Sequence, residues 1–431
     1  MPSKEIKVGY LARVEGEGSL YIKYDRQKVE EVKLKIFEPP RFFEGFLQGK
    51  PHTEAPDITA RICGICPVAY QMSAVHAMEA ALGIEVDERV QQLRRLIYAG
   101  EWIESHTLHI YMLHAPDFLR YHDAIAMAED HKAAVTRGLR MKKIGNKIIQ
   151  VLGGREVHPI NVRVGGFYRL PKKSELLELK DELEWAIEAA KETVDWVAGF
   201  DFPDFEVDYN LVSLFHNDEY PMNRGTIRSS DGLEISSDEY EDHFIETHVP
   251  HSTALHCLQK NGEPYLTGPL ARFALAFQQL PKVCQDLAKK VGIGPDLRNP
   301  YKSIVVRSIE VVYAFVEALR IIEEYEEFAD QQPVQKRQGG RGTSLTEAPR
   351  GSLFHRYDID DNGKIKTAKI VPPTSQNQAR IERDLFELIP KFQGLSDEEL
   401  THRCEQTIRN YDPCISCSTH FLKLQVDRGE S

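Results

Sequence analysis

The first 40 residues alternate between apolar and polar positions, which is the pattern of β-strands. Val32, Leu34 and Ile36 alternate with two lysines, and an apolar stretch at residues 20–22 precedes a polar turn at residues 25–27. A period of two places successive side chains on opposite faces of a sheet. The pattern therefore predicts an antiparallel meander at the N-terminus.

From about residue 59 the apolar positions recur every three or four residues, which is typical of helices. Helices are predicted at residues 59–82, 87–114, 173–197, 302–328, 377–392 and 397–410. Pro116 is expected to end the second of these, because proline cannot continue a helix. Ser396 is expected to cap the last one.

Turn residues separate these helices from short strands. Asp361, Asn362 and Gly363 form a hairpin signal between residues 353–359 and 364–371. Residues 201–267 are expected to be irregular or mixed and residues 335–344 a loop. The predicted fold class is mainly α with small antiparallel β-sheets (α+β) and long central helices.

The pattern also suggests a division of the chain into consecutive parts. These are an N-terminal β meander (1–58), a helical core with the first cysteine pair (59–200), a mixed insert (201–300), a part with a helix, the hairpin and the second cysteine pair (301–420), and a C-terminal tail (421–431).

The composition excludes several classes of protein. Of 431 residues, 42% are hydrophobic and 28% charged, as in globular proteins. Acidic residues exceed basic ones by 66 to 54, so we expect no nucleic-acid partner. Runs of about 18 apolar residues are missing, so no membrane insertion is expected. Residues 1–5 carry no apolar signal region, which favours a cytoplasmic location.

Four of the seven cysteines form two Cys-x-x-Cys pairs near opposite ends of the chain. Cys63 and Cys66 lie in RICGICP, and Cys414 and Cys417 lie in DPCISCSTH. Two intervening residues let both thiolates reach one metal ion, and four thiolates suit a soft transition metal. Spacing alone leaves a structural zinc site open, although zinc pairs usually lie about 15–20 residues apart. A redox dithiol is less favoured, because neither pair lies in a short βαβ pattern.

The residues around these pairs resemble the signature elements of the large subunit of nickel–iron hydrogenases, over nearly the full chain. Similar elements are ARVEG at residues 12–16, ESHTLH at 104–109, HPINVRVGGF at 158–167 and EAPRG at 347–351. PPRFFE at residues 39–44 and the CSTH ending are most similar to the cytoplasmic, nicotinamide-coupled branch, which includes sulfhydrogenase-type alpha subunits. The resemblance implies the fold of that large subunit.

The resemblance also implies that the four cysteines bind a nickel–iron centre. Cys63 and Cys414 would be terminal ligands of nickel, and Cys66 and Cys417 would bridge nickel to iron. In this family the iron also carries carbon monoxide and cyanide. Many members have a histidine four residues after the second cysteine, where this chain has Tyr70. This difference leaves open how the bridging thiolate is hydrogen-bonded.

Four further residues receive roles from the resemblance. Glu15 matches a proton-relay carboxylate, and Arg350 would sit over the metal pair, bind a cyanide nitrogen and polarise dihydrogen. Asp412 would pair with Arg350, and Thr374 would hydrogen-bond the second cyanide. Without the resemblance, these would be interpreted as an exposed glutamate at a strand end, a surface arginine, the start of an Asp-Pro turn and a loop hydroxyl.

A second metal site is implied near the C-terminus. Glu44 and His420, with the carbonyl oxygen of Ile370, would bind magnesium or a second iron. A histidine by itself is more often a hydrogen-bonded polar residue than a ligand. Family members are often cut after the histidine of the last motif once nickel is inserted. That implies a maturation protease and a cleavable tail at residues 421–431.

The predicted function is reversible heterolytic cleavage of dihydrogen into protons and electrons. A thiolate or Arg350 would take the first proton, and protons would leave through Cys417 and Glu15. The sequence has no further cysteine set for iron–sulfur clusters. This implies an iron–sulfur small subunit, with flavin and nicotinamide subunits that pass electrons on to NAD(P). The alternatives are a non-catalytic scaffold subunit holding structural zinc and a dihydrogen sensor.

Overall fold

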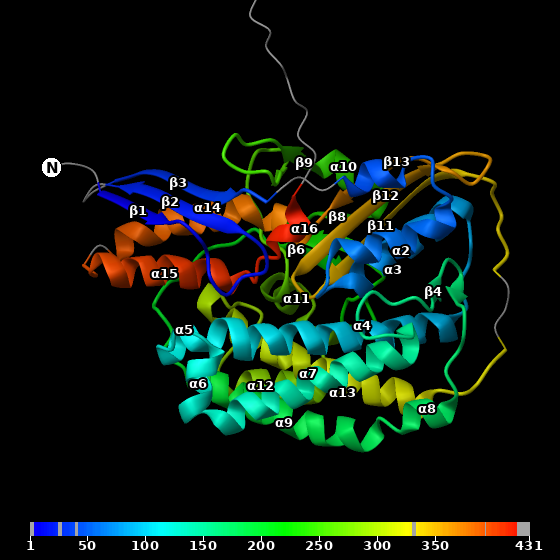
Figure 1. The fold of residues 1–431 in the computed structure, drawn as a ribbon, viewed down its shortest axis with the longest axis horizontal. Coiled ribbons are helices and arrows are strands. Elements are labelled where there is room, and N and C mark those ends of the chain that lie inside the picture. Colours follow the sequence, from blue (N-terminus) through cyan, green and yellow to red (C-terminus); the bar gives the residue numbers. More distant parts are fainter. Residues whose placement is uncertain (1–3, 25–27, 39–41, 330–332, 393, 420–431) are drawn as a thin grey trace, which may run out of the picture.

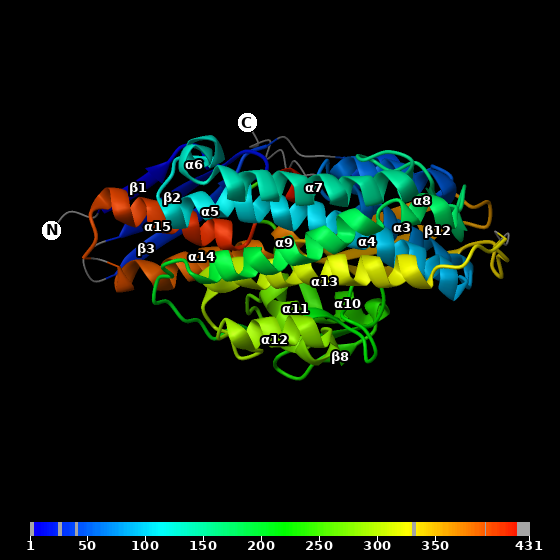
Figure 2. The same cartoon turned by 90° about the horizontal axis from the view of Figure 1, so that it is seen from below.

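Long helices form one layer of the molecule, and small antiparallel sheets lie on the other side (Figure 1). The computed structural model describes residues 4–24, 28–38, 42–329, 333–392 and 394–419. The layer is built from α4 (Glu88–Leu108), α7 (Lys132–Gly153), α9 (Lys180–Ala198) and α13 (Ser303–Glu324), which lie side by side (Figure 2). The predicted class, mainly α with small antiparallel sheets, is confirmed.

The remaining helices are shorter or lie outside this layer. They are α1 (Phe43–Leu47), α2 (Ala55–Thr59), α3 (Pro67–Leu82), α5 (Ala115–Leu119), α6 (Ala124–Asp130), α8 (Lys173–Leu177), α10 (Tyr240–His243), α11 (Pro269–Leu275), α12 (Lys282–Lys290), α14 (Pro373–Lys391), α15 (Asp397–Asn410) and α16 (Ile415–Ser418). Among the described residues, no helix has the length and apolar character needed to cross a membrane.

The N-terminal sheet has the predicted meander topology. β1 (Lys4–Val8), β2 (Gly18–Tyr24) and β3 (Val29–Ile36) are antiparallel and pair in that order. Leu20 lies opposite Leu34, and both side chains are buried. One face of the sheet therefore covers the core, as the alternation of residues requires.

A second three-stranded sheet is formed by β11 (Gly340–Ala348), β12 (Gly351–Ile359) and β13 (Ile365–Val371). The predicted hairpin is confirmed. The predicted loop at residues 335–344 is wrong for its second half, because β11 begins at Gly340. A Cβ atom on Gly342 would collide with the carbonyl oxygen of Ala77 in α3. Glycine here permits a strand to approach a helix closely and does not mark a loop.

The segment at residues 201–267 contains two small sheets of short strands. These are β6 (Val212–Phe215), β7 (Thr226–Ser229) and β8 (Glu234–Ile235) in one sheet, and β9 (Phe244–Thr247) with β10 (His256–Gln259) in another. Two-residue strands β4 (Val162–Arg163) and β5 (Gly166–Phe167) pair elsewhere. The predicted mixed character of residues 201–267 is confirmed.

Proline positions explain two differences between predicted and observed helices. Pro116 does not end the second helix, because a π-helical turn at His109–His114 continues it into α5. Pro116 lies in the first turn of α5, where its missing N–H is tolerated. For the same reason α14 begins at Pro373, four residues earlier than predicted.

Two other predicted helices differ from the observed ones, and one agrees. The predicted helix at 173–197 is split into α8 and α9, and α13 ends at Glu324 instead of residue 328. α15 has the predicted bounds, and the Ser396 hydroxyl accepts a hydrogen bond from the Glu399 amide at 3.2 Å. This is the predicted N-cap.

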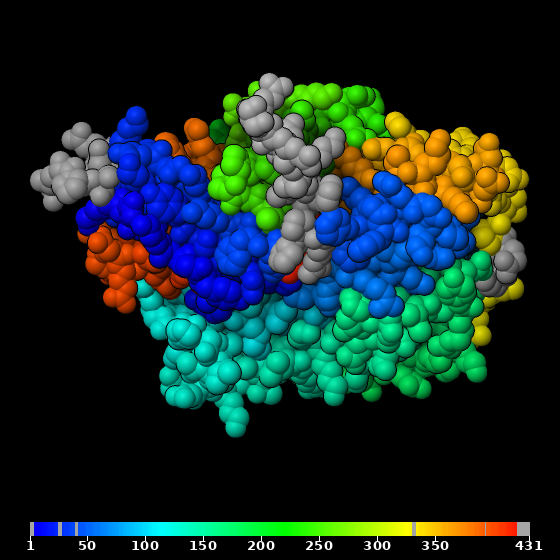
Figure 3. Space-filling model, turned by 45° about the horizontal axis from the view of Figure 1, so that its top comes forward, coloured from blue at the N-terminus to red at the C-terminus, as the bar shows by residue number. Residues whose placement is uncertain are grey.

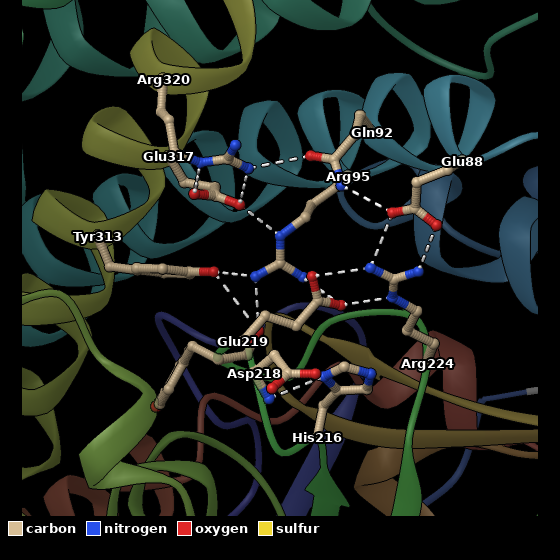
Figure 4. Close-up of polar contacts among 11 residues, drawn as sticks. Glu88, Gln92, Arg95, His216, Asp218, Glu219, Arg224, Tyr313, Glu317 and Arg320 are labelled. Atoms are coloured by element: carbon tan, nitrogen blue, oxygen red, sulfur yellow. Dashed lines mark hydrogen bonds and ion pairs between the residues drawn. The ribbon is translucent and has the colours of Figure 1, made fainter. Parts of the chain in front are cut away.

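An ionic network joins α4 to α13, buried at Arg95 and Glu317 and exposed at Glu88 (Figure 4). Arg95 on α4 contacts Glu317 of α13 at 2.5 Å and Glu219 at 3.2 Å. Arg224 in turn contacts Glu219 and Glu88, each at 2.8 Å. Since removal of one partner leaves an uncompensated buried charge, this network fixes the relative positions of α4, α13 and the segment before β7.

Candidate metal centre

The two cysteine pairs meet in the interior, although nearly the whole chain separates them. The four Sγ atoms all lie within 4.8 Å of one another, with Cys63 to Cys414 at 3.6 Å and Cys414 to Cys417 at 2.7 Å. All four are free thiols, between 2% and 7% exposed. The structure thus brings together the four predicted ligands.

Local backbone structure orients each pair. Cys66 immediately precedes α3, and the Sγ atom of Cys63 accepts hydrogen bonds from the amides of Ile65 (3.3 Å) and Cys66 (3.1 Å). Cys414 and Cys417 lie at the start and within the short helix α16, between the N-terminal sheet and the sheet of β11–β13 (Figure 1). Both pairs therefore present their sulfur atoms from tight turns, as metal-binding pairs do.

The thiols of the cluster ionise unequally. Burial raises the pKa of Cys414 well above its usual value, and the neighbouring cysteines raise it further. Burial also opposes ionisation of Cys63, but hydrogen bonds from the other cysteines and the charge of Arg350 outweigh it, so that the pKa of Cys63 lies well below its usual value. Closely spaced thiols ionise one after another. Because metals bind the thiolate form, the cluster would release its remaining thiol protons when it binds a metal.

Arg350 lies beside the cysteines and is fixed by Asp412. Its Nε atom donates to the main-chain oxygen of Asp412 at 2.8 Å, and Nη2 donates to Oδ1 of the same residue at 3.1 Å. Asp412 has a φ of 50°, a left-handed conformation that is uncommon for residues other than glycine. Burial lowers the pKa of Arg350, but Asp412 and the cysteines raise it more, and the net shift is upward. Arg350 is therefore a permanent positive charge at the cluster.

The turn before Arg350 is held by Arg272, a residue that was not predicted from the sequence. Arg272 on α11 is fully buried and pairs with Glu310 at 2.8 Å and Glu347 at 2.9 Å. It also donates to the main-chain oxygens of Ala348 and Pro349, each at 2.9 Å. No local signal marks this arginine, because its partners lie 38 to 77 positions away in the chain.

Glu15 contacts the second cysteine pair directly. Its Oε2 atom lies 3.1 Å from Sγ of Cys414 and accepts a hydrogen bond from the Ser416 amide at 3.0 Å. The main-chain oxygen of Glu15 accepts from the Ile415 amide at 2.9 Å. The thiol that Glu15 contacts is thus Cys414, whereas the predicted proton route began at Cys417. Glu15 is half-buried and is not the exposed residue of the alternative interpretation.

Gly16 makes this approach possible. A Cβ atom there would lie 2.8 Å from the amide nitrogen of Ser416 and 2.9 Å from Cβ of Ile415, and its φ is +87°. Both the space and the backbone conformation require glycine. This is the physical reason for a glycine directly after Glu15.

Thr374 lies in the first turn of α14, with its side chain buried beside the cluster. Its hydroxyl oxygen accepts a hydrogen bond from the Cys414 amide at 2.9 Å. The hydroxyl proton can still be donated to another group, since a hydroxyl both donates and accepts. Thr374 is therefore more than a loop hydroxyl: it positions Cys414.

Two of the three predicted ligands of the second metal site lie together. Oε1 of Glu44 accepts a hydrogen bond from the Ile370 amide at 2.7 Å. Both residues line a cavity of about 380 Å³ that also reaches Cys417 and Thr419. His420 lies outside the described residues.

Tyr70, which replaces the histidine of many family members, is fully buried. Burial and the nearby cysteines, Cys417 foremost, raise the pKa of its hydroxyl well above the usual value. The hydroxyl has no hydrogen-bond partner among the described residues. Tyr70 therefore stays protonated, with its hydroxyl proton available to a group bound nearby.

α4 supplies two polar groups that sequence reasoning did not select. Glu101 accepts hydrogen bonds from the amides of Val68 (2.6 Å) and Ala69 (3.1 Å) at the start of α3, and burial raises its pKa. Ser105 accepts a hydrogen bond from Arg350 at 3.3 Å. The one local signal is their spacing, because residues 101 and 105 are polar positions one helical turn apart and so lie on the same side of α4.

The fold and the site together define a class of protein. Four buried thiols from two ends of the chain, next to a fixed arginine and a half-buried carboxylate, form a site for a soft transition metal. The neighbouring proton acceptor suits a reaction that releases protons. The fold and the site are therefore those of a metal-site protein whose donor set suits a soft transition metal.

Known proteins match this chain over almost its whole length. The family model described as nickel-dependent hydrogenase matches residues 41–138 and 255–420. Sulfhydrogenase 1 subunit alpha of Pyrococcus furiosus is 35% identical over 97% of this chain and 98% of its own. NAD-reducing hydrogenase HoxS subunit beta of Cupriavidus necator is 27% identical over 97% of this chain and 95% of its own.

Solved structures share the fold. The NAD⁺-reducing NiFe hydrogenase in its H2-reduced state matches with a TM-score of 0.85 and 24% identity, over 97% of this chain and 99% of that one. The NiFeSe hydrogenase of Dm. baculatum matches with a TM-score of 0.79 and 22% identity, over 97% and 100% of the two chains. The chain belongs to the nickel-dependent hydrogenase family as a catalytic large subunit, an oxidoreductase that acts on dihydrogen.

Proposed function

We propose that this chain is the catalytic subunit of a cytoplasmic, multi-subunit hydrogenase that cleaves dihydrogen reversibly and heterolytically. A nickel–iron centre would be held by Cys63 and Cys414 as terminal ligands and by Cys66 and Cys417 as bridges. The observation that carries the proposal is the meeting of four buried thiols within 4.8 Å of one another. The bound metals would supply the position at which dihydrogen binds and is polarised.

The first proton goes to a cysteine thiolate and not to Arg350. The pKa of Arg350 is raised by Asp412 and the cysteines despite its burial, so this guanidinium stays protonated and cannot accept another proton. Arg350 instead supplies positive charge and hydrogen bonds over the cluster, where it would bind a cyanide nitrogen.

We place the outgoing proton on Cys414 and then on Glu15. The Sγ atom of Cys414 lies 3.1 Å from Oε2 of Glu15, within reach for direct transfer. Glu15 is half-buried and so connects the buried cluster with the surface. This route replaces the one that began at Cys417.

Two further groups complete the proposed cofactors. Carbon monoxide and cyanide would be iron ligands, with Thr374 as the hydrogen-bond donor to the second cyanide. Magnesium or a second iron would be bound by Glu44, the carbonyl oxygen of Ile370 and His420. Glu44 and Ile370 meet at the cavity that reaches Cys417, which supports their part of this site.

Electron transfer requires partner chains. Cys257, Cys284 and Cys404 are buried single thiols that join no metal-binding cluster among the described residues, so an iron–sulfur small subunit must accept the electrons. Relatives named as alpha and beta subunits, one of them NAD-reducing, support flavin and nicotinamide subunits that pass electrons to NAD(P). A maturation protease would remove residues 421–431, which lie outside the described residues.

Substitution of one ligand tests this function. We expect Cys414→Ser to abolish nickel binding and dihydrogen oxidation while the chain stays folded, because a hydroxyl is a poor ligand for a soft metal. Cys284→Ala is the matched control, since Cys284 is buried outside the cluster. Nickel content and dihydrogen-dependent dye reduction are the measurements.

The same measurements separate the alternatives. A Cys414→Ser variant that keeps nickel and turnover would contradict the assignment. Zinc as the only metal in the unmodified complex would favour the scaffold, and nickel with iron but little turnover would favour a dihydrogen sensor.

A further inference from the structure

A second cluster of ligating side chains lies outside the cysteine site. His251 lies in the segment that connects β9 to β10, His256 is the first residue of β10, and Glu382 comes from α14. One ligand atom from each residue lies within 4.8 Å of the other two. Nε2 of His251 is 2.8 Å from Oε1 of Glu382, and the two imidazole rings are nearly perpendicular with centroids 5.7 Å apart.

One nitrogen of this cluster is buried without a partner. His256 is 6% exposed, and its Nε2 atom has no hydrogen-bond partner within the described part of the chain. A buried polar atom left in this way costs about 1–3 kcal/mol.

A neighbouring backbone group orients Glu382, and a second hydrogen bond ties α14 to the segment next to His251. Oε1 of Glu382 accepts a hydrogen bond from the Leu34 amide of β3 at 2.8 Å. Gln378, one turn earlier on α14, donates to the Ser252 hydroxyl at 2.8 Å. Such outer contacts fix the direction of ligands in metal sites. Figure 3 shows the green segment that contains this connection packed against the blue N-terminal sheet at the surface.

We propose that His251, His256 and Glu382 bind a divalent transition-metal ion, for which zinc fits best. Two imidazoles and one carboxylate are an established zinc donor set that leaves the fourth position to water. Tetrahedral zinc with bonds of about 2.0–2.2 Å requires ligand atoms about 3.3 Å apart. The ligand atoms lie within 4.8 Å of one another, so binding would draw them closer together through side-chain rotation. The side chains of His251 and Glu382 are 17% and 16% exposed, so the ion has a way in.

The ion would brace the parts of the fold that hold the second cysteine pair. Ala254, between the two histidines, forms an antiparallel bridge with Thr419, two residues after Cys417. α14, on the other side of the ion, carries Thr374, whose hydroxyl holds the Cys414 amide. The proposed ion therefore links α14 to the segment before β10. Both contact the part of the chain that carries the second cysteine pair. This role is structural and does not depend on the proposed hydrogenase mechanism.

Zinc binding by the intact, metal-loaded complex tests the proposal. We expect one zinc ion per chain by elemental analysis, and zinc-edge X-ray absorption with only nitrogen and oxygen ligands at about 2.0–2.2 Å. After removal of this zinc by a chelator, added Zn2+ should bind again at one site. His256→Gln and His251→Gln should weaken that binding more than about 100-fold, since loss of outer contacts alone costs about 10–100-fold.

The matched control is His248→Gln, which changes an exposed histidine of the same connection and should bind zinc as the unmodified chain does. His251→Gln provides a second variant at a more exposed position in case His256→Gln does not fold. Unchanged zinc affinity in either folded variant would overturn the proposal. It would also be overturned if the unmodified complex bound no zinc, or if its zinc showed sulfur ligands, which would place the ion on the cysteines instead.

Discussion

At the scale of single residues, the metal centre combines short motifs with contacts between distant parts of the chain. Cys63, Cys66, Cys414 and Cys417 each lie in a short motif whose spacing already indicates a metal site. The hydrogen bond from Arg350 to Ser105 joins residues 245 positions apart. No local pattern encodes such a contact, because it depends on how α4 packs against the turn before β12.

Glu15 is the residue on which proton transfer depends most directly. We expect Glu15→Gln to slow hydrogen–deuterium exchange and dihydrogen oxidation by about 10²–10⁴-fold, because an amide of the same shape cannot carry a proton. Nickel content should stay unchanged, since Glu15 contacts Cys414 but is not a proposed ligand. Isotope exchange measured by mass spectrometry gives the rate.

Glu17→Gln is the control for this substitution, because Glu17 is exposed and two residues away. An exchange rate in Glu15→Gln equal to that of the control would show that another group carries the proton.

At the scale of elements, helix and strand types were predicted better than their ends. The hairpin of β12 and β13 and the capped helix α15 followed from strong local signals. The continuation of α4 through a π-helical turn did not, because Pro116 is compatible with both an end and a first turn. Tertiary packing decides whether Pro116 follows a helix end or lies in a first turn, and the local sequence pattern does not predict that packing.

The junction of α11 and α13 makes a prediction for stability. Glu310 on α13 pairs with Arg272 of α11 at 2.8 Å and with His106 of α4 at 2.9 Å, and all three are fully buried. We expect Glu310→Gln to destabilise the fold by about 3–5 kcal/mol, because it leaves Arg272 with one carboxylate fewer. Thermal unfolding of the purified chain measures the change.

The control lies on the same helix. Glu323→Gln removes a carboxylate that pairs with Lys180 at 2.7 Å with a side chain 48% exposed, and exposed pairs contribute about 0–1 kcal/mol. Equal unfolding temperatures for the two variants would contradict the importance of the buried pair.

At the scale of the whole molecule, buried ionisable groups make the fold sensitive to acid. Burial lowers the pKa of His76 to about 4 and that of His355 to about 3. Burial opposes ionisation of Glu310, but Arg272 and His106 outweigh it and lower its pKa to about 2. The unfolded chain would bind these protons near pH 6.5 for the histidines and near 4.5 for the glutamate.

The direction of the pH effect follows from these values. The stability that the neutral histidines contribute is complete above pH 6.5 and is lost as the pH falls toward 4 and 3. The contribution of Glu310 is complete above about pH 4.5 and is lost toward pH 2. We expect a constant unfolding temperature between pH 7 and 8 and a decrease below pH 6.5. At pH 5 each of the two histidines should lower the free energy of unfolding by about 2 kcal/mol. An unfolding temperature that stays constant from pH 8 to 5 would contradict this.

The whole architecture was predictable mainly through the resemblance of the motifs. Periodicity alone indicated helices and small sheets, but it did not indicate that the ends of the chain meet at one site. The cluster of His251, His256 and Glu382 had no sequence signal, because its members lie on two distant segments without a shared motif. Such sites become visible only when the fold has placed the segments together.

Infrared spectroscopy of the purified complex tests the central claim most directly. A nickel–iron centre on the four cysteines predicts stretching bands of carbon monoxide and cyanide, groups that no amino-acid side chain supplies, together with about one nickel and one iron per chain at this site. The bands should vanish in Cys414→Ser and persist in Cys284→Ala. An unmodified complex without these bands, with zinc on the four cysteines, would contradict the account.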